Sequence, residues 1–231
     1  MSARRRLFAL DLGAGVLLPT AALLLGCRAS PVRASEAVAL PPEAAPVGVA
    51  ASTDTAVFAG GCFWGVEAVF EHLNGVSTAV SGYAGGKVRS PSYELVSSGS
   101  TGHAESVLVV YDPSRISYEQ LLQVYFTVAH DPTQLNRQGP DVGTQYRSAV
   151  FYRNAAQRDA AQRYIARLTA AKVYRDSIVT EVAPLDVFSP AEAYHQDYLA
   201  HHPNQPYIVI NDAPKLKELR RQFPALYREP A

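Results

Sequence analysis

The chain has 231 residues, and its 21 Lys and Arg balance its 21 Asp and Glu to a formal net charge of zero. This length favours one domain with additional segments, and the absence of a basic field argues against a nucleic-acid partner. Two cysteines, with no CxxC or Cys/His spacing, exclude a disulfide framework and give no sign of a metal site.

The first 27 residues differ in composition from the rest of the chain. The basic run Arg4 to Arg6 precedes a mostly apolar stretch from Leu7 to Leu25, and Gly26 and Cys27 follow it. This order predicts a secretory signal peptide over residues 1–27. A small residue before a cysteine resembles the cleavage site of bacterial lipoproteins, in which Cys27 would become the lipidated first residue.

The expected location is therefore the periplasm or cell envelope, with a lipid anchor at Cys27. The residues Arg5 to Phe8 also resemble a twin-arginine export signal, so that route and the general secretory route both stay open. A membrane anchor that is never cleaved is a further alternative, which Asp11 within the apolar run disfavours.

Residues 28–55 are rich in Ala, Pro, Val and Ser, and no aromatic residue occurs between Phe8 and Phe58. Such a segment buries too little apolar surface to offset the entropy lost on ordering. We expect a disordered, Ala/Pro-rich tether over residues 28–55 and a folded domain over residues 56–231.

Periodicity within the folded domain predicts a mixed order of strands and helices. Apolar residues at Val66, Val69, Phe70 and Leu73 give one helical face, so Cys62 should lie at the first turn of a helix. The expected strands are 56–59, 104–111, 147–153, 178–185 and 207–210, and the expected helices are 117–129 with a capping box at Ser117, 154–172 with Asn154 as cap, one from Ser189, and 215–222. Strands and helices that mix without strict alternation favour an α+β fold with an antiparallel or mixed sheet.

The stretch GGCFWG sets Cys62 between paired glycines and two aromatic rings. A helix N-terminus carries unpaired N–H groups and a partial positive charge, so we expect it to lower the pKa of the Cys62 thiol. The alternative is a small, buried, unreactive cysteine. Phe63 and Trp64 are either ordinary core residues or an apolar wall that receives a methyl group beside the thiol.

Glu105 stands at the entry of a predicted strand, after the glycine- and serine-rich run from Gly99 to Gly102. A partly buried carboxyl group there would have a raised pKa and could donate a proton at neutral pH. An exposed glutamate on an edge strand is the alternative. A phosphate-binding loop is excluded because the run has no lysine and no GxxxxGK pattern.

These two stretches together with three more resemble the A-type peptide methionine sulfoxide reductases. They are GGCFWG, SGYAGG, GSTGHAE, GPDVGTQYRS and AYHQDYL, in the order of the family and spread over Val57 to Tyr207. The resemblance implies a two-layer α+β sandwich with a rolled mixed sheet and packed helices. It also implies that residues 56–231 form a catalytic domain that reduces methionine S-sulfoxide in peptides and repairs oxidised proteins.

The resemblance assigns the central roles in this chemistry. Cys62 matches the nucleophile that attacks the sulfoxide sulfur and becomes a sulfenic acid. Phe63 and Trp64 match the pocket for the S-methyl group, and Glu105 matches the acid that protonates the sulfoxide oxygen.

Further positions complete the implied site. Tyr93 and Tyr146 match tyrosines that help to hold the sulfoxide oxygen, and Asp141 matches a supporting acid. His103 and His195 lie within matched motifs, and we expect structural hydrogen bonds from both. The family needs no metal and no bound organic cofactor.

The chain departs from many family members because no cysteine follows the helix motif. Without a resolving cysteine, and with Cys27 lipidated, we expect a single-cysteine enzyme whose sulfenic acid is reduced by an external thiol, such as a thioredoxin-like protein. The other expected partners are oxidised proteins or peptides, and we expect a monomer.

Two other classes compete with this interpretation. Another thiol enzyme, a peroxidase or a cysteine hydrolase, would explain Cys62 but not the aromatic pair together with Glu105; a hydrolase also needs a histidine to activate the thiol. A lipid-anchored binding domain that has lost activity is the non-enzymatic alternative.

Overall fold

The computed structural model describes residues 53–229, which fall within the second of two units, Met1–Val32 and Arg33–Ala231. The predicted signal peptide and the predicted tether up to residue 52 lie outside the described residues. In chain order the elements are β1 (Asp54–Gly60), α1 (Phe63–Glu71), β2 (Val76–Ala84), α2 (Tyr93–Ser97), β3 (Ala104–Tyr111), α3 (Tyr118–Val124), the π-helix η2 (Tyr125–Ala129), β4 (Arg137–Gln138), β5 (Asp141–Val142), the 3-10 turn η3 (Thr144–Tyr146), β6 (Ser148–Tyr152), α4 (Ala155–Ala170), β7 (Glu181–Pro184), β8 (Phe188–Pro190), the 3-10 turn η4 (Ala193–His195), α5 (Tyr198–His201), the π-helix η5 (Ile208–Asp212) and α6 (Ala213–Gln222).

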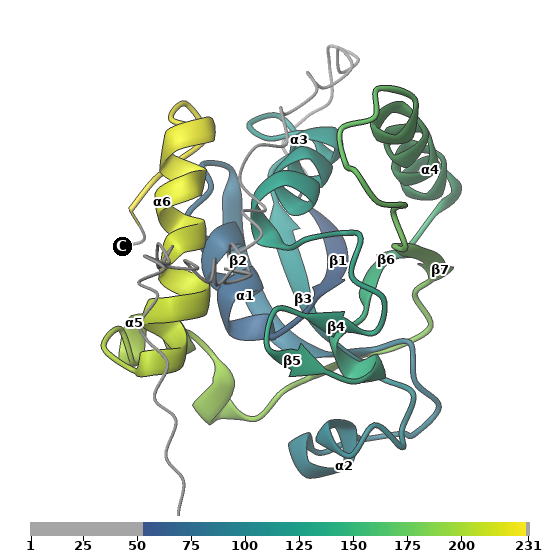
Figure 1. Ribbon diagram of the computed structural model, residues 1–231, viewed down its shortest axis with the longest axis vertical. Coiled ribbons are helices and arrows are strands. Elements are labelled where there is room, and N and C mark those ends of the chain that lie inside the picture. The colour runs from purple at the N-terminus through teal and green to yellow at the C-terminus, as the bar shows by residue number, and fades with distance from the viewer. Residues whose placement is uncertain (1–52, 230–231) are drawn as a thin grey trace, which may run out of the picture. The chain divides into compact units, whose positions relative to one another are not determined.

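Six strands form one sheet in the order β7-β6-β1-β3-β2-β8 (Figure 1). The pairs β1–β3, β1–β6, β2–β3 and β2–β8 are antiparallel, whereas β6–β7 is parallel. The sheet is therefore mixed and curled, and the predicted α+β fold is confirmed. The strands β4 and β5 form a separate two-stranded ribbon.

Alternation along β1 divides the core between the two faces of the sheet. Ala56 and Phe58 belong to the larger apolar cluster, which also holds residues of α1, α3, α4 and α6, whereas Val57 and Ala59 belong to a smaller cluster on the other face. The helices therefore pack on one face of the sheet, and α1 and α3 lie across its strands in Figure 1. The Phe58 ring stacks on Phe70 of α1 and Tyr125 of η2 at 5.1 and 4.9 Å, which fixes α1 against the sheet.

Local signals located several helix starts correctly. Ser117 and Gln120 form the predicted capping box, in which each side chain bonds to the backbone of the other residue. The predicted helix over 117–129 is α3 continued by η2. Asn154 Oδ1 accepts a hydrogen bond from Gln157 N at 2.9 Å and caps α4 as predicted.

Two predicted elements near the C-terminus are wrong. The expected helix from Ser189 is strand β8, because Ser189 pairs with Tyr83 along β2 and Glu192 is used elsewhere: its carboxylate accepts from Tyr93 N and Tyr83 Oη. The expected strand over 207–210 is helical and runs through η5 into α6. Its apolar run mixes buried Ile208 with exposed neighbours, which suits a helix on the surface of the core.

Other boundaries differ from the predicted ones, and several elements, among them β2, α2, β4 and β5, had no predicted counterpart. Strand β2 escaped prediction because polar residues interrupt its alternation, although it lies between β3 and β8, and the short helix α2 was also unexpected. β7 is shorter than the expected strand over 178–185. β1 begins at Asp54, two residues before the expected start of the domain. Among the described helices, none combines the length and the apolar content that crossing a membrane requires.

Candidate active site

Cys62 lies at the junction between β1 and α1, where it is the N-cap residue of the helix. The chain reverses through Gly61, whose φ of +90° is unfavourable for residues with a side chain. A Cβ on Gly61 would also lie 2.4 Å from Cβ of Gln138. Only glycine fits this turn, which places the free, buried Cys62 thiol at the start of α1.

Glu105 projects from β3 toward the same helix start. Its Oε2 accepts a hydrogen bond from Phe63 N at 3.1 Å, and the residue is 2% exposed. The exposed edge-strand alternative is therefore wrong. Burial raises the pKa of Glu105 to about 8, with smaller contributions from Asp141 and Asp212, while the Phe63 N–H acts in the opposite direction. A carboxyl group in this state is protonated at neutral pH and can donate.

The Cys62 thiol does not have the lowered pKa that its position suggested. Burial raises the pKa of Cys62 well above its usual value, and the carboxylates of Glu105 and Asp212 raise it further. The Trp64 N–H at the helix start and Lys215 act in the lowering direction but are weaker. The helix dipole therefore contributes as expected, but in the unliganded site desolvation outweighs it.

Aromatic rings line one side of the Cys62 turn. The buried Phe63 ring lies 5.9 Å from Tyr83 and 5.1 Å from His195. Trp64 stacks on Tyr198 with centroids 3.7 Å apart and planes 8° apart. These contacts fix the rings of the two residues that follow Cys62 in the chain, as an apolar wall at this turn would require.

The two histidines of the motifs differ in their contacts. His195 Nδ1 accepts a hydrogen bond from Trp64 Nε1 at 3.1 Å, and burial lowers the pKa of His195, so the ring is neutral with its proton on Nε2. The expected structural bond is present there. The His103 ring lies against Gly86 instead, and its Nδ1 has no hydrogen-bond partner among residues 53–229.

The remaining predicted residues gather around the same point. Tyr93 opens α2, and its ring lies 4.4 Å from that of His195. Burial and the charge of Glu105 raise the pKa of Tyr93 and of Tyr146, and both phenols also feel the charge of Cys62, so both stay protonated. Asp141 Oδ2 accepts a hydrogen bond from the Tyr207 hydroxyl. The structure thus brings all seven predicted site residues together.

Comparison with known proteins agrees with this geometry. The family model described as peptide methionine sulfoxide reductase matches residues 54–226. The chain belongs to the peptide methionine sulfoxide reductase family. The reaction of this family is the reduction of methionine S-sulfoxide in peptides, so the chain is an oxidoreductase that acts in protein repair.

The alignments with individual relatives cover most of the length of each relative. Peptide methionine sulfoxide reductase MsrA 2 of Mesorhizobium japonicum is 58% identical over 180 residues, which cover 78% of this chain and 92% of the relative. The protein of the same name from Synechocystis sp. is 49% identical over 75% of this chain and 81% of its own.

Two solved structures share the fold. Mxr1 from Saccharomyces cerevisiae in reduced form superposes with a TM-score of 0.62 at 34% identity, over 66% of this chain and 87% of that one. Methionine sulfoxide reductase A of Corynebacterium diphtheriae gives 0.57 at 38% identity, over 66% and 76% of the two chains.

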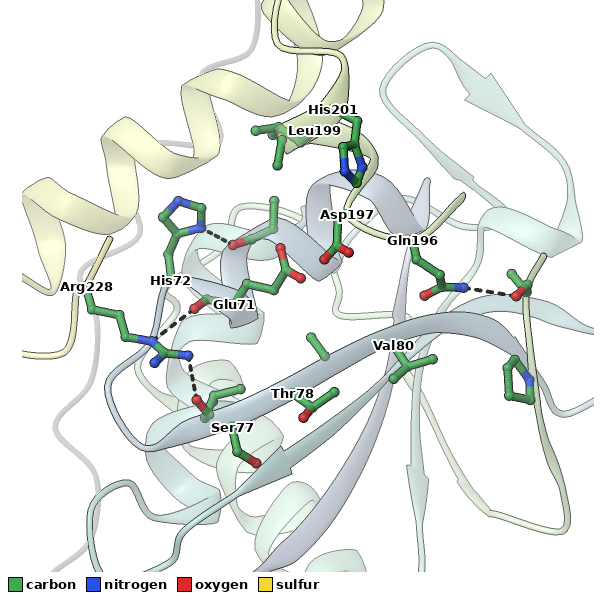
Figure 2. A pocket seen from close by; sticks show the side chains of 16 residues that line it. Glu71, His72, Ser77, Thr78, Val80, Gln196, Asp197, Leu199, His201 and Arg228 are labelled. Carbon is green, nitrogen blue, oxygen red and sulfur yellow. Dashed lines mark hydrogen bonds between the residues drawn. The ribbon is translucent and has the colours of Figure 1, made fainter. Parts of the chain in front are cut away.

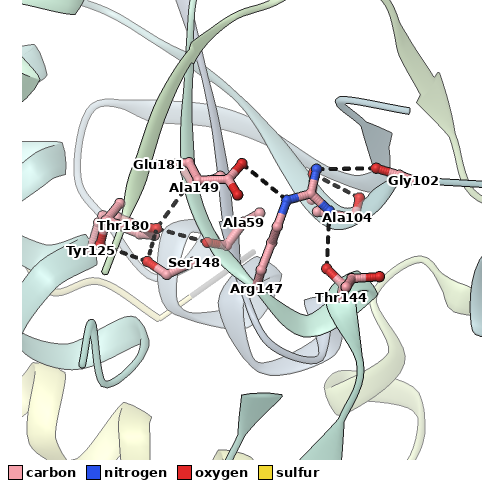
Figure 3. A network of polar contacts seen from close by, with 11 residues as sticks. Ala59, Gly102, Ala104, Tyr125, Thr144, Arg147, Ser148, Ala149, Thr180 and Glu181 are labelled. Atoms are coloured by element: carbon pink, nitrogen blue, oxygen red, sulfur yellow. Dashed lines mark hydrogen bonds and ion pairs between the residues drawn. The ribbon is translucent and has the colours of Figure 1, made fainter. Parts of the chain in front are cut away.

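A polar network on one side of the reductase site fixes the loops that carry Tyr146 and Glu105 (Figure 3). The guanidinium of Arg147 donates to Thr144 O at 3.0 Å and to Gly102 O at 3.1 Å, and it pairs with Glu181 at 3.2 Å. The first bond holds η3, which ends in Tyr146, and the second holds the turn that leads into β3 and Glu105. One arginine therefore ties two predicted site loops to β7.

Three residues near Cys62 escaped prediction. Tyr207 lay in a run that was interpreted as a strand, Lys215 began the predicted helix over 215–222, and Asp212 lay between these two elements. In the structure Asp212 Oδ1 accepts from Lys215 Nζ at 3.1 Å, and Asp212 is 1% exposed. No motif indicated these residues, because their proximity to Cys62 depends on how η5 and α6 pack against α1.

A cavity of about 800 Å³ lies at the other end of α1 (Figure 2). Glu71 and His72 line it, together with Val76 to Val80 of β2, residues 196–197 and residues 199–201. Arg228 closes one end by donating to Glu71 O and Val76 O at 3.2 and 2.7 Å. Cys62 starts α1 and Glu71 ends it, so this cavity is separate from the reductase site. Within the described part of the chain, no group of three or more His, Cys, Asp or Glu is arranged to hold a metal ion.

Proposed function

We propose that Cys62 reduces methionine S-sulfoxide by attacking its sulfur while Glu105 protonates the sulfoxide oxygen. The observation that carries this proposal is the buried Glu105 carboxyl group, whose raised pKa keeps a proton beside the helix start that bears the thiol. The oxygen of a sulfoxide leaves sulfur poorly unless it is protonated, so an acid at this place removes the main obstacle.

The atoms of the first half-reaction balance. The Cys62 thiolate forms a bond to the sulfoxide sulfur while Glu105 gives its proton to the sulfoxide oxygen. The bond between the two sulfur atoms and the S–O bond of the substrate then break as a new S–O bond forms on Cys62, which becomes a sulfenic acid that carries the proton from Glu105. The products are the methionine thioether, the sulfenic acid and the Glu105 carboxylate. Cys62 is oxidised and methionine sulfoxide is reduced.

The surrounding side chains fit the substrate in this proposal. The rings of Phe63 and Trp64 receive the S-methyl group in this proposal, because they are the apolar side chains that follow Cys62 and pack against each other at its turn. Tyr93 and Tyr146 keep their hydroxyl protons at neutral pH and can donate to the sulfoxide oxygen. Asp141, held by Tyr207, supports the polar side of the site.

Recycling requires an external thiol. The chain has two cysteines, of which Cys62 lies in the described residues and Cys27 in the predicted lipoprotein signal. In the proposed step an external thiol attacks the sulfenic sulfur, water leaves, and a mixed disulfide forms. A second thiol then releases Cys62 as a thiol and forms a disulfide with the first, as a thioredoxin-like dithiol protein can do.

We also propose export to the periplasm or cell envelope with a lipid on Cys27, and a monomeric enzyme acting on oxidised proteins and peptides. The basic run, the apolar stretch and Cys27 support the export. Metabolic labelling with a fatty-acid analogue tests it: label on the chain, lost in Cys27→Ala, is expected. An unlabelled chain in the soluble fraction of the cytoplasm would refute it.

A turnover assay tests the function. The chain with dithiothreitol should reduce a peptide that contains methionine S-sulfoxide and leave the R epimer unchanged. Cys62→Ser should be inactive, and Cys27→Ser, the matched control, should keep full activity. Equal rates for Cys62→Ser and the wild-type chain would refute the role of Cys62, and lost turnover in Cys27→Ser would show that Cys27 takes part in recycling.

A further inference from the structure

The ion pair Asp212–Lys215 packs directly against the helix that Cys62 begins. Gly65 lies three residues after Cys62, so the two residues share one side of α1. A Cβ on Gly65 would lie 2.0 Å from Asp212 Oδ1 and 2.7 Å from Lys215 Nζ. The pair therefore fills the space that the missing side chain of Gly65 leaves, and the charges of both residues act on the Cys62 thiol.

The two oxygens of Asp212 are in different situations. Oδ1 accepts from Lys215 Nζ at 3.1 Å, whereas Oδ2 is buried and has no hydrogen-bond partner among residues 53–229. An unpaired carboxylate oxygen that is buried costs considerable free energy, so such an atom generally has a partner in the working protein. The proposed function assigns none to it.

The proposed chemistry needs a thiolate but leaves the proton of the thiol without a destination. Glu105 cannot accept it, because Glu105 must arrive at the reaction already protonated. The other charged or titratable groups around Cys62, Asp212 and Lys215 are Tyr93, His130, Asp141, Tyr146 and Tyr207. The tyrosines keep their own protons, and Asp141 is already paired with Tyr207.

We propose that Asp212 accepts the proton of the Cys62 thiol on Oδ2 and that Lys215 stabilises the thiolate that remains. This inference rests on the proposed function only for the use to which the thiolate is put. The S–H bond of Cys62 breaks and an O–H bond forms on Asp212.

The charge balance of the buried site favours this transfer. Before it, the ammonium of Lys215 faces the carboxylate of Asp212 and a neutral thiol; after it, the same ammonium faces a neutral acid and a thiolate. The net charge is unchanged, so the transfer adds no uncompensated charge to the interior. Burial and Asp141 raise the pKa of Asp212, which makes it a more competent acceptor than an ordinary aspartate.

The test is the pH dependence of Cys62 alkylation in the full chain without methionine sulfoxide. Iodoacetamide is the probe, and peptide mass spectrometry separates Cys62 from Cys27. In the wild-type chain Cys62 and Asp212 share one proton, so the alkylation rate should show a segment that does not depend on pH between their two titrations. Asp212→Asn keeps an acceptor for Lys215 but cannot take the proton, so its rate should rise about tenfold per pH unit with no such segment.

Substitutions of Lys215 provide an independent test of the proposal. Lys215→Met should lower the alkylation rate of Cys62 about tenfold, the equivalent of roughly one pKa unit, while Lys215→Arg should retain most of it. Lys217→Met, which removes an exposed lysine of the same helix, should match the wild-type chain.

Three results would overturn the proposal: a wild-type profile without the pH-independent segment, an Asp212→Asn profile that keeps it, or a Lys215→Met rate equal to the wild-type rate. Because no sulfoxide is present, failure of the reductase assay with these profiles intact would refute the proposed function alone.

Discussion

The backbone N–H of Phe63 donates to Oε2 of Glu105 across 3.1 Å. Phe63 follows Cys62 directly, so this bond holds the Glu105 carboxyl group at the peptide unit next to the residue that carries the thiol. Glu105 reaches this place because β3 lies in the interior of the sheet, between β1, which leads to Cys62, and β2. The acid and the nucleophile are therefore positioned by sheet order rather than by a flexible loop.

Glu105→Gln should lower kcat for methionine S-sulfoxide by about 10²- to 10⁴-fold, the range typical of a lost general acid. Glutamine can still accept the Phe63 N–H, so the loss reports the proton and not the fold. Asp159→Asn, at a half-exposed site on α4, is the control and should have no effect. A rate within twofold of the wild-type chain would exclude Glu105 as the proton donor.

The pH profile of the wild-type enzyme should reflect the same group. Glu105 must be protonated to act, and its pKa in the free enzyme is raised to about 8, so kcat/KM should fall as pH rises through about 8. The measurement is kcat/KM against pH, because this parameter reports the groups of the free enzyme. A rate that keeps rising well above that pH would contradict the assignment.

Part of this site follows from local sequence signals, and part does not. The Ser117 capping box, the Asn154 cap and the position of Cys62 at a helix start depend on neighbours within a few residues, and the structure confirms them. The burial of Glu105 depends on which strands flank β3, which no local pattern reports.

The incorrect predictions have the same origin. Ser189 has good helix-capping chemistry, but pairing with β2 and the contacts of Glu192 to distant tyrosines outweigh it. The prediction of a lowered pKa for Cys62 took the helix dipole into account but not the burial of the thiol, which raises that pKa. Asp212 reaches the site only because η5 and α6 pack on Gly65.

Tyr207→Phe removes the hydroxyl that donates to Asp141 and leaves a half-buried carboxylate short of one hydrogen bond. We expect kcat/KM to fall about tenfold, since such a loss costs on the order of 1–2 kcal/mol. Tyr152→Phe on β6 removes a hydroxyl away from Asp141 and should leave kcat/KM unchanged. Equal values for both variants would show that Tyr207 does not support the site.

Trp64 is the single tryptophan of the chain, so its fluorescence reports the bond to His195. Burial lowers the pKa of His195 from 6.5, so acidification below that pH should eventually protonate Nδ1 and place two donors face to face. The bond from Trp64 to neutral His195 therefore contributes its full stabilisation of the fold above pH 6.5, and this stabilisation is lost as pH falls through the lowered pKa of His195.

The Trp64 emission should change in this acidic range in the wild-type chain. In His195→Gln the change should be absent, because the glutamine acceptor does not titrate. His201→Gln, at an exposed position, should behave as the wild-type chain. An unchanged transition in His195→Gln would assign it to another group.

Gly65→Ala should destabilise the protein although alanine favours helices by about 1 kcal/mol over glycine. The new Cβ would lie 2.0 Å from Asp212 Oδ1, so the buried ion pair must move. We expect a net loss of about 1–3 kcal/mol in the free energy of unfolding, measured by urea denaturation. Gly139→Ala, whose Cβ meets nothing within 4 Å, should lose only about 1 kcal/mol from its positive φ. A more stable Gly65→Ala chain would contradict the close approach of Asp212.

The central claim is that one thiol carries out the reduction, and a single-turnover experiment tests it most directly. The reduced chain is mixed with excess methionine S-sulfoxide peptide and no reductant, and both released methionine and the state of Cys62 are measured. We predict one methionine per chain, with a sulfenic acid trapped on Cys62 and no disulfide to Cys27. No methionine released, with dithiothreitol also failing to start turnover, would contradict the account.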